Sequence, residues 1–525
     1  MELPLAITIG VCFLVASFIY KFIVYPAFFS PLSKIPAANW TIHICPLWIY
    51  WIRYINIENQ TILKLHQAKG PIVRIGPSEL SVNCYDGGLK TIYGGGFPKH
   101  DFYARRFTNY DTENMFTMVD SKKHSARKRM LSSVYSKSTV LSSPTIRETT
   151  KTMLFERLLP IFQHSVETGQ SVEVHSLSYA YAMDSFMAYQ FGLSLGSNFV
   201  QDVEKRKWYM HNFFSRRPYL FWPDNLPGLT SALQKIGIRL IPKWCDDATE
   251  DLASWNLEIC DQAEKKLAAE TDIPPGDYPV IYATERAQFM KADGKERPLN
   301  GQSYPPRLEL ASDAYDHNAA AHETSGDTLT WVYYEMSRNP SLQKQLREEL
   351  LSLDPPINFP PEDPSNIVLP DFKAVDNLPL LGAILQETLR IWTAVPGAQP
   401  RLTPYPSCSL AGYDNIPPNV RVQSYASVLH RNPEVFPDPE AWKPERWLKT
   451  SPEQLAEMKR WFWAFGSGGS MCIGSNVAMH TMKHAIAAIY TNYTTSIVDA
   501  EGIEQDEGFS AGPKGNKLVL KFHRI

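Results

Sequence analysis

The stretch FGSGGSMCIG, Phe465 to Gly474, places a cysteine at the end of a glycine-rich loop. Glycine lets a backbone turn tightly and approach a flat ligand closely. Cys472 stands where a helix is expected to begin, and the free N–H groups of a helix start favour a thiolate. A phosphate loop does not fit, because no GxxxxGK[ST] pattern follows a strand here. The loop predicts either an anionic cysteine ligand or a buried structural cysteine, and leaves both open.

Upstream, the segment AAAHETSGDTLTW (Ala319 to Trp331) is expected to be helical. Its three leading alanines give the helix a thin face that a bulky group can approach. Glu323 and Thr324 place an acid beside an alcohol in mid-helix, and such a pair can relay protons to a buried reacting centre. The alternative is an ordinary solvated polar face.

Two further patterns are weak when taken singly. In QETLR, Glu387 and Arg390 are three residues apart and share one helical face, which is typical of an ordinary surface pair. Arg446 follows in PERW (Pro444 to Trp447). The order of the patterns is informative: an alanine-rich helix with ETS, then ExxR, then PERW, then F-x-x-G-x-x-x-C-x-G near the carboxyl end.

In this order and spacing, the four patterns resemble the cytochrome P450 superfamily over nearly the whole chain. The segments YPAFFSPLSKIP, VRIGPSELSV and NPEVFPDPEAWKPERW are similar to those of the membrane-bound enzymes of filamentous fungi. The resemblance implies a mainly α-helical cytochrome P450 fold with small β-sheets, preceded by an N-terminal transmembrane helix.

By this resemblance, Cys472 is the axial thiolate ligand of the iron in haem b (iron protoporphyrin IX). Phe465 would pack against the thiolate side, and Gly468 and Gly474 would let the loop lie close to the ring.

The other motifs receive roles by the same resemblance. Glu323 and Thr324 would guide protons to dioxygen. Further residues would border the oxygen site (Ala320 and Ala321) or form a structural salt-bridge triad behind the haem (Glu387, Arg390 and Arg446).

The two haem propionates need cations, since buried carboxylates are costly without partners. The segment KKHSARKRMLSS, residues 122–133, resembles the helix that supplies some of them. The predicted partners are His124, Lys128 and Arg401. For the other cations of this run we expect a solvated helix face or a patch for an acidic redox partner: Lys122, Lys123, Arg127 and Arg129.

Ser470 departs from the family, which usually has a basic residue two places before the cysteine. Serine offers one neutral hydrogen bond where a guanidinium would offer a charged, bidentate contact. Either Lys128, His124 and Arg401 suffice and haem binds less firmly, or the protein has drifted and is weakly active. We favour the first reading, and it predicts that Ser470→Arg slows haem loss.

Composition sets outer limits. The chain has 525 residues, 44% of them hydrophobic, with 52 basic and 55 acidic residues and a net charge of −3. This balance gives no electrostatic footprint for nucleic acid. Seven scattered cysteines without a CxxC pair argue against a disulfide framework and for a reducing compartment. Length favours several domains, but no linker separates them, so one large domain is given equal weight.

The amino terminus predicts a membrane anchor. Leu3 to Tyr20 is apolar apart from Thr8 and Ser17, and as a helix it spans roughly 27 Å, close to the bilayer core. A cleaved signal peptide is the alternative, but the run lacks a basic n-region. Lys21 follows the run and favours a cytosolic body. We therefore expect a single-pass protein of the endoplasmic reticulum membrane.

Three regions are predicted: an anchor at 1–24, a proline-marked neck at 25–40 and a single catalytic domain at 41–525. Because Pro26, Pro31 and Pro36 disfavour helix, we expect the neck to be extended.

The leading functional hypothesis is a haem-thiolate monooxygenase that inserts one oxygen atom into a hydrophobic small molecule in fungal secondary metabolism. Its electrons would come from NADPH through a separate NADPH-cytochrome P450 reductase, with cytochrome b5 as an optional second donor. A haem-thiolate isomerase or dehydratase is an alternative, which the Glu323–Thr324 pair argues against. A non-catalytic haem-binding membrane protein is a third, which Ser470 keeps open. A ferrous–CO spectrum and reductase-dependent product formation separate them.

Overall fold

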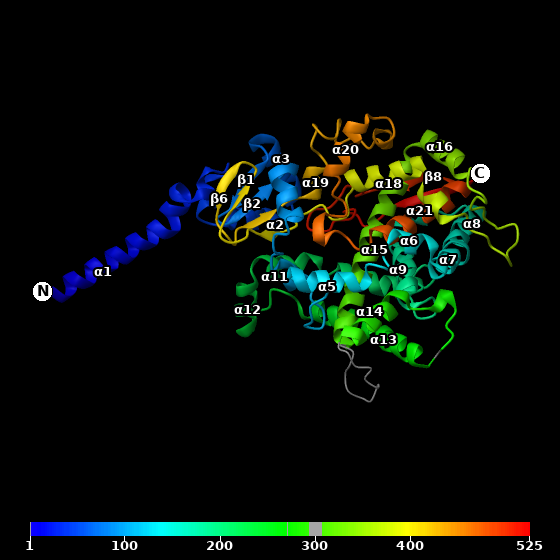
Figure 1. The fold of residues 1–525 in the computed structure, drawn as a ribbon, viewed down its shortest axis with the longest axis horizontal. Helices are drawn as coiled ribbons and strands as arrows, with labels where there is room; N and C mark the ends of the chain where they lie inside the picture. Colours follow the sequence, from blue (N-terminus) through cyan, green and yellow to red (C-terminus); the bar gives the residue numbers. More distant parts are fainter. Residues whose placement is uncertain (1, 270, 293–306) are drawn as a thin grey trace.

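The structure, a computed structural model, describes residues 2–269, 271–292 and 307–525. Within these residues the chain is mostly helical and carries small sheets, as predicted. The helical body lies at one end of a long, isolated amino-terminal helix (Figure 1).

Helices make up most of the chain. The α-helices up to residue 292 are α1 (Glu2–Ile19), α2 (Leu47–Tyr54), α3 (Glu58–Lys69), α4 (Phe102–Phe107), α5 (Ser121–Leu131), α6 (Lys137–Ser142), α7 (Pro144–Lys151), α8 (Leu159–Thr168), α9 (Val174–Phe191), α10 (Val203–Phe214), α11 (Phe221–Asn225), α12 (Pro227–Lys235), α13 (Lys243–Ala269) and α14 (Val280–Ala292). Those after residue 307 are α15 (Arg307–Ser337), α16 (Pro340–Leu350), α17 (Phe372–Asp376), α18 (Pro379–Ile391), α19 (Ala426–Leu429), α20 (Pro452–Trp461) and α21 (Ser475–Asn492). Wider π-type and tighter 3₁₀ segments are η1 (Tyr20–Phe29), η2 (Pro31–Lys34), η3 (Trp40–His43), η4 (Tyr85–Gly94), η5 (Thr152–Leu158), η6 (Arg217–Tyr219), η7 (Pro275–Asp277), η8 (Pro444–Trp447) and η9 (Gly468–Ser470).

The strands form three small sheets among the described residues. A four-stranded sheet has the order β1 (Ile72–Gly76), β2 (Glu79–Val82), β7 (Arg421–Gln423) and β4 (Arg401–Leu402). Only the β2–β7 pairing in it is parallel. The other sheets join β3 (Val172–Glu173), β9 (Val519–Arg524) and β8 (Tyr493–Asp499), and β5 (Cys408–Leu410) with β6 (Tyr413–Ile416).

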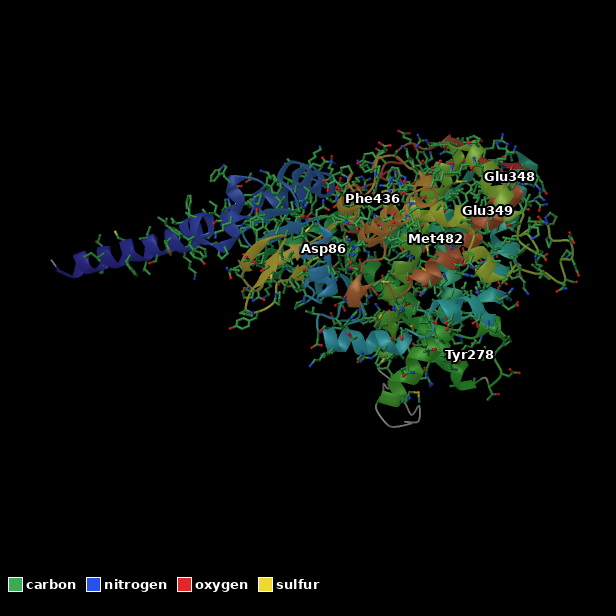
Figure 2. The ribbon with its side chains drawn as sticks, turned by 45° about the horizontal axis from the view of Figure 1, so that its top comes forward. Asp86, Tyr278, Glu348, Glu349, Phe436 and Met482 are labelled. Atoms are coloured by element: carbon green, nitrogen blue, oxygen red, sulfur yellow. The ribbon has the colours of Figure 1, made fainter. Side chains whose placement is uncertain are left out.

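Helix α15 forms the centre of the body. Most of its residues are buried, which is typical of a helix enclosed by others, and Asp316, Ala320 and Thr324 are among the exceptions. It packs against α9 and α21, and Trp331 near its end stacks on Trp392 with ring centroids 5.4 Å apart. Met482 of α21 lies within this core, 1% exposed (Figure 2). The centre of the fold therefore places the alanine-rich segment next to the helix that follows the cysteine loop.

The amino-terminal helix stands apart from the body. Its side chains project freely in Figure 2, and Phe13 and Leu14 are 71% and 68% exposed. Among the described residues, the segment Ile7–Phe29 is long and apolar enough to cross a membrane. An exposed apolar surface of this size is typical of a membrane segment and not of a core helix.

The prediction of an extended neck is wrong for its first half. The chain stays helical through η1, with Pro26 inside it, and η2 follows at once. The φ of proline suits a helix, and its ring clashes mainly with the carbonyl four residues earlier. The wider turns of a π-helix relieve that clash, as the bond from Ser30 N–H to the Tyr25 carbonyl (2.8 Å) illustrates.

Candidate active site

The cysteine loop is held by backbone contacts. Cys472 N–H donates to the Phe465 carbonyl at 2.9 Å, closing the loop. Gly468 has a φ of +66°, and a Cβ there would lie 2.2 Å from the Tyr93 carbonyl oxygen of η4. Only glycine fits this position, because both the left-handed backbone and the close approach exclude a side chain. At Gly474, by contrast, an added Cβ would only make ordinary contact with the cysteine sulfur, at 3.9 Å.

The Cys472 thiol is reached by solvent and is also enclosed by protein atoms. It is exposed to solvent, yet burial raises its pKa. Backbone N–H groups of Gly474 and Ser475 and the ammonium of Lys128 act in the opposite direction. The N–H groups at the helix start therefore lower the pKa of the thiol and favour the thiolate, as predicted. In the protein without a bound ligand, however, burial has the larger effect on this pKa. A thiol with both properties lines an enclosed space and needs a cation to be held as thiolate.

One face of α15 carries a residue that acts on this thiol. Asp316, Ala320 and Thr324 follow at intervals of four residues and so share a face. Ala320 is exposed although most of α15 is buried, and Asp316 acts electrostatically on Cys472. Thr324 Oγ1 donates to the Ala320 carbonyl at 2.8 Å. Ala321, predicted for the same border, is only partly exposed and also packs against the core.

Glu323 points elsewhere. Its carboxylate pairs with the guanidinium of Arg217 in η6 and takes a hydrogen bond from Ser510. Burial opposes the charged form, but these partners hold the pKa of Glu323 below its usual range. The acid and the alcohol are chain neighbours, while the carboxylate is engaged away from the Ala320–Thr324 face. The role of Arg217 was missed, since nothing in the sequence near residue 217 marks it.

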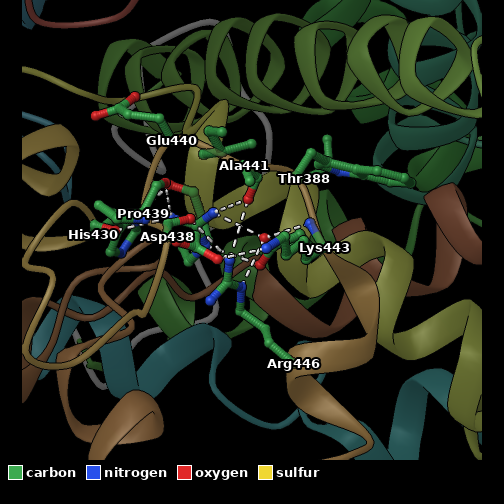
Figure 3. A network of polar contacts seen from close by, with 12 residues as sticks. Thr388, His430, Asp438, Pro439, Glu440, Ala441, Lys443 and Arg446 are labelled. Atoms are coloured by element: carbon green, nitrogen blue, oxygen red, sulfur yellow. Dashed lines mark hydrogen bonds and ion pairs between the residues drawn. The ribbon is translucent and has the colours of Figure 1, made fainter.

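Glu387, Arg390 and Arg446 form one buried network. Figure 3 shows Arg446 and Lys443 among its polar contacts. Glu387 accepts from Arg390 at 2.8 and 2.9 Å and from Arg446 at 2.9 Å. It also accepts from the Trp447 indole at 3.0 Å and from the backbone N–H of Lys443 at 2.8 Å. Glu387 and Arg390 are both 0% exposed. The network ties α18 to the PERW segment, which positions the chain leading to the cysteine loop.

The three predicted propionate partners lie near one another. Burial lowers the pKa of His124 to about 4, and repulsion from Lys99, Lys128 and Arg401 adds to this shift. Lys128 Nζ donates to the carbonyls of Gly469 (3.0 Å) and Met471 (2.6 Å), and so fastens α5 to the cysteine loop.

Lys99 belongs to the same cluster and was missed. It is paired across an antiparallel bridge with Arg401, and both are buried, at 6% and 5% exposed. The sequence signal is faint, a single lysine among the aromatic residues of segment 94–107. In the described part of the chain, no ion pair involves Lys99, Lys128 or Arg401.

One prediction for α5 is wrong. Arg127 was expected on a solvated face or in a partner patch, but it is 6% exposed and paired with Asp313 and Glu309. It faces inward because residues 124, 127 and 131 share the buried face of α5. Lys122, Lys123 and Arg129 are exposed, as expected of a solvated face.

Comparison with known proteins gives one consistent result. The family model described as cytochrome P450 matches residues 44–520. A cytochrome P450 monooxygenase of Aspergillus hancockii is 26% identical, covering 95% of this chain and 92% of its own length. One from Gibberella zeae is 26% identical over 88% of this chain and 87% of its own, and one from Aspergillus versicolor is 28% identical over 81% and 95%.

Proposed function

The chain belongs to the cytochrome P450 family, and on that premise we propose that it inserts one oxygen atom from O2 into a hydrophobic small molecule, using electrons from NADPH delivered by a separate reductase. The observation that carries this proposal is the position of Cys472. Cys472 is exposed at the end of a loop that glycine conformation fixes, and Asp316 of α15 acts on its thiol electrostatically.

The residues present fit haem b. An exposed cysteine can ligate iron, and the alanine of α15 leaves room for a flat ring. Cations that have no ion pair with a carboxylate among the described residues suit two propionates. Cys472 would hold the iron, and His124, Lys128 and Arg401 would hold the propionates. Bound haem supplies the activation of O2. The protein supplies the ligand, the proton path and the exclusion of water.

Within this proposal, Thr324 holds a proton beside the reacting centre. Its hydroxyl donates to the Ala320 carbonyl in the structure and so provides a polar hydrogen on this face of α15. Glu323 is the nearest acid to Thr324 along the helix. Its partner Arg217 has a side chain that is 29% exposed and links Glu323 to solvent. Because Arg217 stabilises the charged carboxylate, Glu323 can take up a proton only when this ion pair loosens.

For the substrate, we infer an apolar or aromatic molecule. The rings of Phe107, Phe116 and Phe509 are partly exposed and pack together with centroids 5.1 to 6.5 Å apart. Such rings suit an apolar ligand. A place in fungal secondary metabolism is part of the proposal and is supported by the fungal origin of the related monooxygenases.

The proposed location is the endoplasmic reticulum membrane, with residues 1–24 as anchor, 25–40 as neck and 41–525 as the cytosolic catalytic domain. The isolated apolar segment Ile7–Phe29 supports a membrane attachment. We further propose NADPH-cytochrome P450 reductase as electron donor, with cytochrome b5 as an optional second donor. The exposed Lys122, Lys123 and Arg129 of α5 offer positive charge to such acidic partners.

Reconstitution tests the proposed reaction. Compound libraries are screened for a substrate-induced spin-state shift of the full-length protein, and hits are incubated with NADPH and a fungal reductase. The proposal predicts an oxygenated product that requires both, with one atom of label from ¹⁸O2. A product formed without NADPH and without incorporated label would instead indicate isomerase or dehydratase chemistry.

A further inference from the structure

Asp327 of α15 is a fully buried acid without a role in the proposed reaction so far. It is 0% exposed. Its Oδ1 accepts a hydrogen bond from the Tyr179 hydroxyl of α9, while its Oδ2 has no hydrogen-bond partner among the described residues. A side chain at Gly512 would collide with Oδ1, so the chain near the carboxyl end closes directly over this acid. A buried polar atom without a partner destabilises a protein, so its presence calls for an explanation.

The position of Asp327 on α15 brings it next to the acid–alcohol pair. It follows Glu323 by four residues and Thr324 by three, and side chains at these spacings are neighbours on a helix, with Cβ atoms about 5–6 Å apart. Arg217 of η6 pairs with Glu323 and acts electrostatically on Asp327 as well. The two acids therefore share a single guanidinium.

Only one of these two acids carries its proton near neutral pH. Two buried carboxyl groups beside one cation do not both ionise readily, because like charges repel each other. Although burial opposes the charged form, Arg217 holds the pKa of Glu323 below its usual range. Burial, followed by repulsion from Glu323, raises the pKa of Asp327 to about 8. Glu323 is therefore the anion of the ion pair, and Asp327 is the neutral acid beside it.

The aromatic neighbours add no further charge to this cluster. The ring centroids of His175 and His322 lie 4.7 and 5.8 Å from that of Tyr179. Burial lowers the pKa of each histidine to about 4, so both are neutral near pH 7. Burial also raises the pKa of Tyr179 well above its usual value, so Tyr179 remains a hydroxyl donor to Asp327. The charges that act on Asp327 from the described residues are therefore those of Glu323 and Arg217.

We propose that Asp327 holds the proton that Glu323 passes to Thr324, and that Tyr179 orients the Asp327 carboxyl for this transfer. The inference rests on the proposed function, since it concerns the proton supply of that reaction. The Asp327 carboxyl gives its proton to the Glu323 carboxylate as the ion pair with Arg217 loosens, and Asp327 becomes the anion beside the guanidinium. Glu323 then gives this proton to the Thr324 hydroxyl, which passes its own toward the reacting centre. A proton from solvent restores Asp327.

An infrared titration of the full-length holoenzyme tests the protonation state directly. The C=O stretch of a protonated carboxyl should appear in the difference between wild type and Asp327→Asn and vanish as the pH rises through about 8. Asp316, whose pKa is also about 8, contributes equally to both proteins and cancels. Glu323→Gln removes the repelling charge and leaves Arg217 unpaired, so the band should titrate at lower pH. Tyr179→Phe removes the donor that favours the anion, so the band should titrate at higher pH. A difference spectrum without the band would overturn the proposal.

The coupling of NADPH oxidation to oxygenated product tests the use of this proton. In the wild type, coupling should fall as the pH rises through about 8. In Asp327→Asn it should be lower by about fivefold or more near neutral pH and should not change over this pH range. The asparagine can still accept from Tyr179, so a purely structural role predicts the wild-type coupling and pH profile, and that result would overturn the proposal. Glu335→Gln, which alters another buried acid of α15, bonded to Trp392 at 3.0 Å, is the matched control and should keep the wild-type profile. A wild type that shows the carboxyl band but no reductase-dependent product refutes the proposed function and leaves the protonated Asp327 established.

Discussion

The buried carboxylate of Glu387 offers the sharpest stability prediction. Its oxygens accept five hydrogen bonds from two arginines, an indole and a backbone N–H, at 2.8 to 3.0 Å. Glu387→Gln keeps the shape but removes the charge and turns one oxygen into a donor. Arg390, which is 0% exposed, would then face that donor without its counter-charge. We expect the free energy of unfolding to fall by about 3–5 kcal/mol, the usual cost of breaking a buried ion pair from one side.

Glu440→Gln is the matched control. Glu440 lies in the same region and pairs with Arg431 at 3.1 Å, but its side chain is 67% exposed. Because this carboxylate is mostly in solvent, and Arg431 keeps its bonds to the Ser427 and Ile391 carbonyls, loss of the charge should cost no more than about 1 kcal/mol. Both variants are unfolded in guanidinium chloride as detergent-solubilised holoenzymes and followed by circular dichroism and haem absorbance. A Glu387→Gln protein as stable as the Glu440→Gln protein would refute the view that this network holds α18 to the PERW segment.

Two other predictions concern the proton path and pH. Thr324→Val keeps the side-chain shape but removes the hydroxyl, so NADPH oxidation should continue while the fraction coupled to oxygenated product falls by about tenfold; unchanged coupling would contradict the role of Thr324. Although burial opposes its ionisation, Arg421 and Arg53 lower the pKa of Glu79 from 4.5 to about 2. The unfolded chain therefore takes up a proton first, and stability that is present above pH 4.5 is lost as the pH falls toward 2. Glu79→Gln should flatten this part of the stability–pH curve. An unchanged slope would contradict the assignment of this pH dependence to Glu79.

Much of the architecture could be predicted from local sequence patterns. The cysteine loop, the alanine-rich helix and the Glu387–Arg390 spacing are readable because each depends on residues close together in the chain. Residues 319–331 were expected to be helical, and α15 (Arg307–Ser337) contains them. The helix after the cysteine begins at Ser475, three residues later than expected, because Gly474 is its cap.

Pairings between distant segments could not be read in the same way. The contact of Arg217 with Glu323 spans 106 residues, and Arg127 reaches Asp313 across 186. Lys99 gains its meaning only when the fold sets it beside Arg401. Charge alone predicts the surface for such residues, and only tertiary structure shows which of them are buried against a partner. The prediction of an extended neck failed for a local reason. The rule that proline breaks a helix assumes α-helical turns, and the turns of η1 are wider.

The central claim is that Cys472 ligates haem iron through its thiolate. The ferrous–CO spectrum of the full-length protein tests it most directly, with Cys472→Ser and the matched Cys84→Ser, which alters a partly exposed cysteine of another segment. We predict a strongly red-shifted Soret band for the wild type and for Cys84→Ser, and its loss in Cys472→Ser. A red-shifted band that survives in Cys472→Ser, or a wild type without one, would contradict the account.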